Sequence, residues 1–226
     1  MHRMLRRTLL GAMLAGLAPG ASAETPASPP SAMTEVAFGA YQDGRLDEAA
    51  RLFELAAKAG NRLAQFNFAM MLFRGEVVSA DANAGWRWLR RAAGAGLPQA
   101  QFNLGLLYDH GNGVDKSHAT AAEWYRRAAE QGHTDAQVNL ATMYFVGQGV
   151  ARDPVEAARW YLLAAKAGDV GAQYIVGTMY EGGYGMGRDP RLAAHWYLEA
   201  ARQGDAVAQK KYEALGLRPD EEAPGR

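Results

Sequence analysis

The stretch AQFNLGLLYDHGNGV, residues 100–114, decides the fold of this 226-residue chain, because its outline recurs at a fixed spacing. Its opening Ala-Gln dipeptide stands at five places, each 36 residues after the last: Ala64, Ala100, Ala136, Ala172 and Ala208. Each of the first four alanines is followed 24 residues later by a tryptophan, namely Trp88, Trp124, Trp160 and Trp196. A period of this length indicates a stack of structural repeats.

Each repeat contains the pattern of two amphipathic helices. Counted from the alanine, apolar or small residues fall at offsets 0, 4, 5 and 8 in the first half, as in Ala136, Leu140 and Tyr144. In the second half they fall at offsets 21, 24, 25, 28 and 29, as in Trp160 and Tyr161. Both patterns place one apolar stripe along a helix of 3.6 residues per turn.

Local signals mark the helix ends. Asp153, Pro154 and Glu156 predict a capping box at the start of a second helix. A glycine that suits a left-handed residue after a helix stands at Gly60, Gly96, Gly132, Gly168 and Gly204. Gly-x-Gly pairs between the helices, at residues 111–113, 147–149 and 183–185, predict turns, because a phosphate-binding loop needs a third glycine and a preceding strand.

These residues resemble the Sel-one-like repeat, a relative of the tetratricopeptide repeat. Its pattern runs A-x-x-x-L-G-x-x-Y-x-x-G-x-G-V and then A-x-x-W-Y-x-x-A-A-x-x-G, and the resemblance covers about residues 34–215. It implies an all-α fold, a right-handed α-solenoid superhelix of stacked antiparallel helix pairs. In the related family the first helix of every pair lines a concave groove, which is the expected binding site.

The repeat register predicts the domain bounds. After a leader we expect a Pro/Ser/Ala linker at 24–33, a tetratricopeptide-like capping repeat at 34–60, full repeats at 61–96, 97–132, 133–168 and 169–204, a capping helix at 205–217 and a disordered tail at 218–226. Terminal repeats of a solenoid depart from the consensus because they must cover the ends of its core.

Residues 1–23 predict a cleavable signal peptide. Arg3, Arg6 and Arg7 precede an apolar run at residues 9–17, and the small-residue sequence Ala21-Ser22-Ala23 follows. The run is about half the length that a membrane-spanning helix needs. We therefore expect an exported protein without stable membrane insertion, most simply periplasmic, with an extracellular location as the alternative. The arginine pair leaves the general and the twin-arginine export routes both open.

Composition excludes several function classes. Lys and Arg number 24, as do Asp and Glu, so removal of the three leader arginines leaves a net charge of −3 and no basic excess for nucleic acid. The absence of cysteine excludes disulfides, thiolate catalysis and cysteine-ligated zinc. The histidines outside the leader have no metal-site spacing, so we expect no metal or cofactor.

A hydrolase is the alternative function. Cysteine-rich members of this repeat family are linked with β-lactam binding and hydrolysis, which would imply a β-lactam or cell-wall-like substrate. This chain has neither those cysteines nor a Ser-x-x-Lys or Gly-x-Ser-x-Gly motif. We therefore predict a non-enzymatic scaffold, an adaptor or regulator in the bacterial cell envelope that binds a protein or peptide. A structural assembly subunit is a third hypothesis.

The predicted groove is defined by first-helix positions. Asn67, Asn103 and Asn139 share offset 3, where amides could either clamp a peptide backbone or bond the neighbouring repeat, and both interpretations stay open. Offsets 2 and 10 vary between repeats, as partner selectivity would need, and supply Phe66, Phe102, Tyr174, Arg74 and His110. The four tryptophans are predicted as core rather than as an aromatic binding box.

Overall fold

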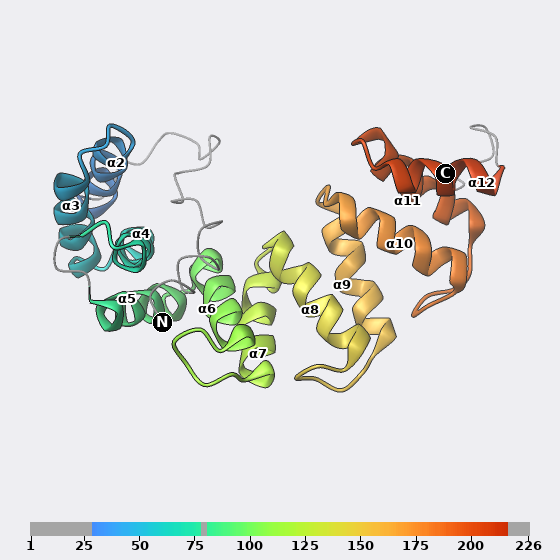
Figure 1. The fold of residues 1–226 in the computed structure, drawn as a ribbon, viewed down its shortest axis with the longest axis horizontal. Coiled ribbons are helices and arrows are strands. Elements are labelled where there is room, and N and C mark those ends of the chain that lie inside the picture. The colour runs from blue at the N-terminus through green and yellow to red at the C-terminus, as the bar shows by residue number, and fades with distance from the viewer. Residues whose placement is uncertain (1–28, 78–80, 217–226) are drawn as a thin grey trace. The chain divides into compact units, whose positions relative to one another are not determined.

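The computed structural model describes residues 29–77 and 81–216, and all regular structure in these ranges is helical (Figure 1). The helices are α2 (Pro29–Gln42), α3 (Leu46–Lys58), α4 (Arg62–Arg74), α5 (Ala82–Gly94), α6 (Pro98–His110), α7 (His118–Glu130), α8 (Thr134–Val146), α9 (Pro154–Lys166), α10 (Val170–Gly182), α11 (Pro190–Arg202) and α12 (Ala206–Leu215). The predicted all-α architecture of adjacent helix pairs is confirmed.

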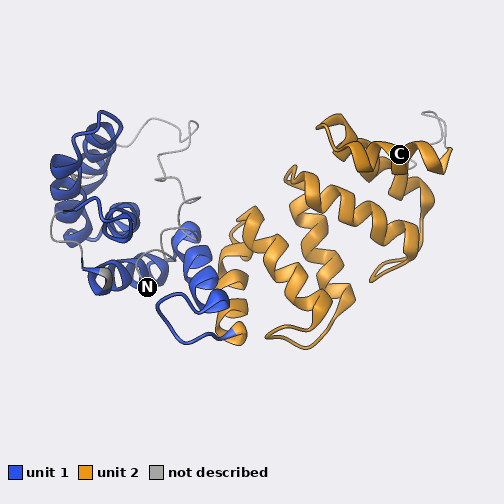
Figure 2. Cartoon of the chain, in the orientation of Figure 1, with its two compact units in different colours: residues 1–117 blue, residues 118–226 orange. Residues whose placement is uncertain are grey.

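The helices form two compact units, residues 1–117 and 118–226 (Figure 2). In the first unit, consecutive helices from α2 to α6 pack against one another. In the second unit, α7 to α12 do the same. In the 36-residue register, α4, α6, α8, α10 and α12 are first helices, whereas α5, α7, α9 and α11 are second helices.

The first helix begins earlier than the sequence predicts. Helix α2 starts at Pro29, so the expected linker bound at residue 33 is wrong. Proline is tolerated there because the N–H groups of a first helical turn have no partner within the helix. The hydroxyl of Thr34 donates to the carbonyl oxygen of Pro30 at 2.7 Å, within the helix. The signal peptide expected at residues 1–23 and the tail expected at 218–226 lie outside the described residues.

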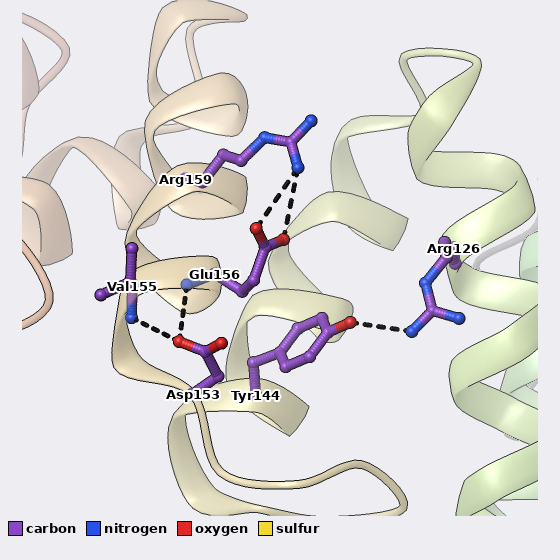
Figure 3. Close-up of polar contacts among 6 residues, drawn as sticks. All are labelled: Arg126, Tyr144, Asp153, Val155, Glu156 and Arg159. Carbon is purple, nitrogen blue, oxygen red and sulfur yellow. Dashed lines mark hydrogen bonds and ion pairs between the residues drawn. The ribbon is translucent and has the colours of Figure 1, made fainter.

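Aspartates cap the second helices α5, α9 and α11, but the capping box predicted at α9 is only half formed (Figure 3). The Asp153 carboxylate accepts from the backbone N–H groups of Val155 and Glu156, at 3.0 and 3.1 Å. The expected return bond from the Glu156 side chain is absent, because the backbone N–H of Asp153 donates instead to the backbone carbonyl oxygen of Tyr144 at 2.8 Å. Glu156 pairs instead with Arg159 at 3.4 Å.

The glycines after the helices and in the inter-helix turns have the predicted left-handed backbone, with φ from +71° to +96° at Gly111, Gly185 and Gly204 among others. Gly185 also lies against the preceding second helix, α9, where an added Cβ would overlap the carbonyl oxygen of Pro154. Close backbone contact therefore explains the second glycine of this turn, and no phosphate needs to be invoked.

In three of the second helices, α5, α7 and α11, the residue after the tryptophan is more deeply buried than the tryptophan itself. Leu89, Tyr125 and Tyr197 are fully buried at this position, whereas in α9 Trp160 and Tyr161 are each 5% exposed. Trp88 is only partly buried but packs against the core of the first unit, whereas the prediction of a core tryptophan is wrong for the partly buried Trp124. Successive helical residues differ by about 100° in direction, so offset 24 falls at the edge of a stripe centred on offset 25.

Solvent-side arginines cover the two partly buried tryptophans. The guanidinium of Arg91 lies 4.8 Å from the ring centroid of Trp88, and that of Arg127 lies 4.6 Å from Trp124. Such stacking places the cation over the electron-rich ring face.

The glutamine of the Ala-Gln dipeptide joins consecutive helices. Its side-chain amide donates to a backbone carbonyl eight residues earlier, at the end of the preceding second helix: Gln65 to Ala57, Gln101 to Ala93, Gln137 to Ala129 and Gln173 to Ala165, at 3.1–3.2 Å. Each of these carbonyls also accepts from the backbone N–H of the glycine that follows the helix, at 3.0–3.1 Å, so the repeated glutamine adds a second hydrogen bond and ties the next helix to this one.

Candidate functional site

The first helices carry the positions that the sequence singled out, but the asparagines at offset 3 are not a uniform surface ladder. Asn67 is 0% exposed and Asn103 is 4% exposed. The Asn103 amide donates to the carbonyl of Gln99 in its own helix at 2.7 Å. Asn139 alone is partly exposed. The clamp interpretation therefore fails for Asn67 and Asn103, and Asn103 bonds its own helix rather than the neighbouring repeat.

The positions at offsets 2 and 10 also differ in burial. Phe66 is buried, whereas Phe102 and Tyr174 are partly exposed. Arg74 donates to the hydroxyl of Tyr41 at 3.0 Å, which commits it to an intramolecular contact. His110 is exposed, with its Nδ1 2.9 Å from the carbonyl oxygen of Leu106.

Tyr174 belongs to a pocket in the second unit. The pocket has a volume of about 290 Å³ and is lined by Phe145 of α8, Tyr161 of α9, Tyr174, Ile175, Thr178 and Met179 of α10, and Tyr184 of the following turn. We call it the α10 pocket. Five of its residues lie on the first helices α8 and α10, the face on which the sequence predicted the binding site.

Two hydroxyl groups of the α10 pocket, those of Tyr161 and Thr178, are hydrogen-bonded within the protein. The hydroxyl of Tyr161 lies 2.7 Å from that of Thr142, and Thr178 donates to the carbonyl of Tyr174 at 3.2 Å. Burial raises the pKa of Tyr161, and the Thr142 hydrogen bond opposes that effect. Tyr161 is therefore uncharged at neutral pH, since an unperturbed tyrosine already titrates near pH 10.

A partly exposed polar network connects α10 with α11 and α12. Tyr197 of α11 donates to Glu181 at 2.6 Å and lies 3.1 Å from the hydroxyl of Thr178. Lys211 of α12 donates to the same Glu181 oxygen at 2.9 Å. Burial, reinforced by Glu181, raises the pKa of Tyr197, while the bonds from Tyr197 and Lys211 lower the pKa of Glu181. This network fixes α10 against α11 and α12.

Sequence reasoning found Tyr174 but missed Phe145 and Tyr184, which form the exposed rim. A comparison between repeats could have found Phe145. The equivalent residue in the first repeat, Phe73, is 8% exposed because it packs edge-on against Trp86, with ring centroids 6.3 Å apart. The third repeat has Ala158 at the position of Trp86, and Phe145 is 38% exposed.

The first unit has a larger pocket of a different kind. Its volume is about 620 Å³, and its lining includes Asp47, Arg51, Glu54, Phe68 and Trp88. Its wall ends at Val77, beside residues 78–80, which lie outside the described part of the chain. We therefore base the candidate site on the α10 pocket.

The described histidines have contacts within the fold. His133 accepts from the backbone N–H of Ala136 at the start of α8, at 3.4 Å. The ring of His118 contacts Gln148 at 2.8 Å, and that of His195 packs on Trp196 with centroids 5.2 Å apart. Within residues 29–77 and 81–216, no three metal-ligating side chains gather in one place. None of the helices in these ranges combines the length and apolarity of a membrane span.

Comparison with known proteins identifies the repeat. The family model for the Sel1 repeat matches residues 30–61, 62–97, 98–133, 134–169 and 170–205. The structure of a Sel1 repeat protein from Oxalobacter formigenes is 34% identical, with a TM-score of 0.72, over 85% of this chain and 84% of that one. A protective antigen present in uropathogenic Escherichia coli strains, displaying an SLR fold, is 31% identical with a TM-score of 0.76 over 82% of this chain, which spans 41% of the antigen's length. No curated protein matches.

Proposed function

The chain belongs to the Sel1 repeat family, and from that membership we propose that it is an exported scaffold that binds a protein or peptide partner through the exposed faces of its first helices. Proteins of this family are generally non-enzymatic and commonly bind other proteins. Packing and hydrogen bonds inside the repeats account for most of the residues that might otherwise suggest chemistry.

The α10 pocket is the observation that carries the proposal. Two large apolar side chains on its rim, Phe145 and Tyr184, are 38% and 56% exposed. Val146, next to Phe145 at the end of α8, is exposed as well. Contiguous apolar patches on protein surfaces often mark interaction sites, and the Phe145 and Tyr184 side chains lie together at the rim of one apolar pocket.

The leader supports the cellular location that we propose. Residues 1–23 have the three successive regions of a signal peptide, so the mature chain would begin at Glu24 in the periplasm. An adaptor or regulator in the bacterial cell envelope would fit that location. N-terminal sequencing of the protein from the periplasmic fraction should read from Glu24, and recovery of the uncleaved chain from the cytoplasm would contradict export.

Site-specific crosslinking in cells tests partner binding. A photoreactive amino acid at Asn139 would lie on the partly exposed face of α8, whereas one at Leu163 would lie on an exposed position of the second helix α9. We expect mass spectrometry to recover a partner from the Asn139 position and not from Leu163. Identical products from both positions, or none from Asn139, would contradict the proposal.

A further inference from the structure

The α10 pocket differs from a general adhesive surface in being closed on one side, compact and uncharged. We propose that it receives one bulky, uncharged apolar side chain, of the tryptophan, phenylalanine or leucine kind, from a peptide segment of the partner. This inference rests on the proposed function and names the chemistry that the site selects.

The size of the pocket supports a single side chain. Its volume of about 290 Å³ is at the lower limit for pockets that hold a whole small ligand, typically about 300–1,000 Å³. Ile175 and Met179 provide aliphatic contacts, and Tyr161 and Tyr174 provide rings. Anchors that dominate protein interfaces are large side chains, often aromatic, that fill pockets of this kind.

The charge distribution excludes an ionic anchor. The residues that line the α10 pocket are uncharged at neutral pH, and the helices that supply most of them have one charged residue each, Asp135 near the start of α8 and Glu181 near the end of α10. Glu181 is already paired with Lys211 at 2.9 Å. The guanidinium of Arg152 donates to the backbone carbonyl of Phe145 at 3.1 Å but does not line the pocket. A charged side chain in the pocket would therefore lose its hydration without a counter-charge among the lining residues, which is unfavourable.

The first repeat shows the packing that we expect of the anchor. There the ring of Trp86 meets Phe73 edge-on, with an angle of 89° between the rings, and leaves Phe73 buried. In the third repeat Ala158 replaces that tryptophan, and Phe145 is 38% exposed although Tyr161 of the same helix α9 lines the pocket with it. An aromatic side chain of the partner would supply at Phe145 the contact that the chain itself supplies at Phe73.

The test uses random peptides displayed on phage, selected on the purified protein, with the enriched sequences made as fluorescent synthetic peptides. We expect the enriched peptides to share an aromatic or branched aliphatic residue. Replacement of that residue by alanine or lysine should weaken binding about tenfold or more.

Variants of the protein locate the bound side chain. Phe145→Ala and Tyr184→Ala, tested separately, should each weaken binding several-fold, and both positions are exposed enough for the fold to survive. Leu163→Ala is the matched control, because Leu163 is 40% exposed on α9 but does not line the pocket. Binding to this control should equal binding to the original protein.

The outcomes separate this inference from the proposed function. Selected peptides that share a charged residue instead, or that bind both rim variants as tightly as the original protein, would contradict the proposal of an apolar anchor. Either result would leave the proposal of partner binding intact. Failure to select any peptide would overturn the pocket as a peptide site, while the crosslinking experiment would still decide whether a folded partner binds elsewhere.

Discussion

The side-chain amide of Gln137 on α8 donates to the carbonyl oxygen of Ala129 on α7 at 3.1 Å, and both residues are buried. The same bond recurs in the neighbouring repeats, so it links each first helix to the second helix before it. The carbonyl of Ala129 also accepts from the backbone N–H of Gly132 at 3.0 Å, so loss of the glutamine removes one of two hydrogen bonds, a net cost of about 0.5–1.5 kcal/mol. We predict that Gln137→Met, which keeps the volume of the side chain, destabilises the protein by that amount in urea unfolding.

Gln209 supplies the control for that prediction. It has the same offset in α12, but it is exposed and bonds only to Glu213 in its own helix. Gln209→Met should leave the free energy of unfolding nearly unchanged. Equal effects of the two substitutions would show that the bond to Ala129 is not what the glutamine contributes.

The burial pattern of the second helices predicts unequal costs for two tryptophans. Trp160→Ala removes a buried ring and should cost about 3–5 kcal/mol in the free energy of unfolding, as should Tyr125→Ala. Trp124→Ala should cost clearly less, because Trp124 is only partly buried and its outer face is covered by Arg127. Equal costs for Trp124 and Trp160, measured by urea unfolding, would contradict the assignment of offset 25 as the centre of the core stripe.

Alanine substitutions at Gly185 and Gly168 distinguish the cost of a left-handed backbone from the cost of close packing. Both have positive φ, +71° and +94°, so alanine at either position should cost roughly 1–2 kcal/mol through the left-handed backbone alone. An added Cβ at Gly168 meets no atom within 4 Å, but one at Gly185 overlaps the carbonyl oxygen of Pro154. Gly185→Ala should therefore lower the melting temperature further than Gly168→Ala, and the reverse order would contradict the packing of this turn.

His133 predicts a pH dependence of stability. Its ring nitrogen can accept from the N–H of Ala136 only when unprotonated, and burial lowers its pKa below the ordinary 6.5, with Asp135 opposing that shift. Because the folded state holds this proton less tightly than the unfolded state, the contribution is complete above pH 6.5 and declines as the pH falls through that value toward the folded pKa.

A substitution taken from another repeat isolates this effect. Asn61 occupies the equivalent position before α4 and accepts from the N–H of Ala64 at 2.9 Å. His133→Asn should keep the cap and lose its titration. Between pH 7 and pH 5 the original protein should lose more stability than the variant, and parallel stability curves would exclude a role for His133.

The sequence predicts the fold well because its repeated residues act locally. Asp153 caps its own helix and Gly204 follows the end of another, so residues close in the sequence are enough to predict both roles. Burial of Asn67 depends on the packing of adjacent helices, which periodicity alone does not specify. The error at Trp124 has the same origin, since offsets 24 and 25 both fit an apolar stripe and only the packed structure shows which one is central.

The α10 pocket could be predicted only in part. Tyr174 and Ile175 mark it as departures from the preceding repeats, at offsets 2 and 3. Phe145 corresponds to Phe73 of the first repeat, which Trp86 covers. The residue that corresponds to Trp86 in the third repeat is the small Ala158, on another helix, and this leaves Phe145 exposed. Such a signal lies in a pair of positions rather than in one, and it emerges only when the contact between the helices is known.

Hydrogen–deuterium exchange of the protein with its crosslinked partner tests the central claim most directly. Binding through the first-helix face should slow exchange in α8 and α10, which supply Phe145 and most of the other residues of the α10 pocket. The exposed surface of α9 around Leu163 should show no comparable change. Protection confined to the second helices α9 and α11 would contradict binding through the first-helix face.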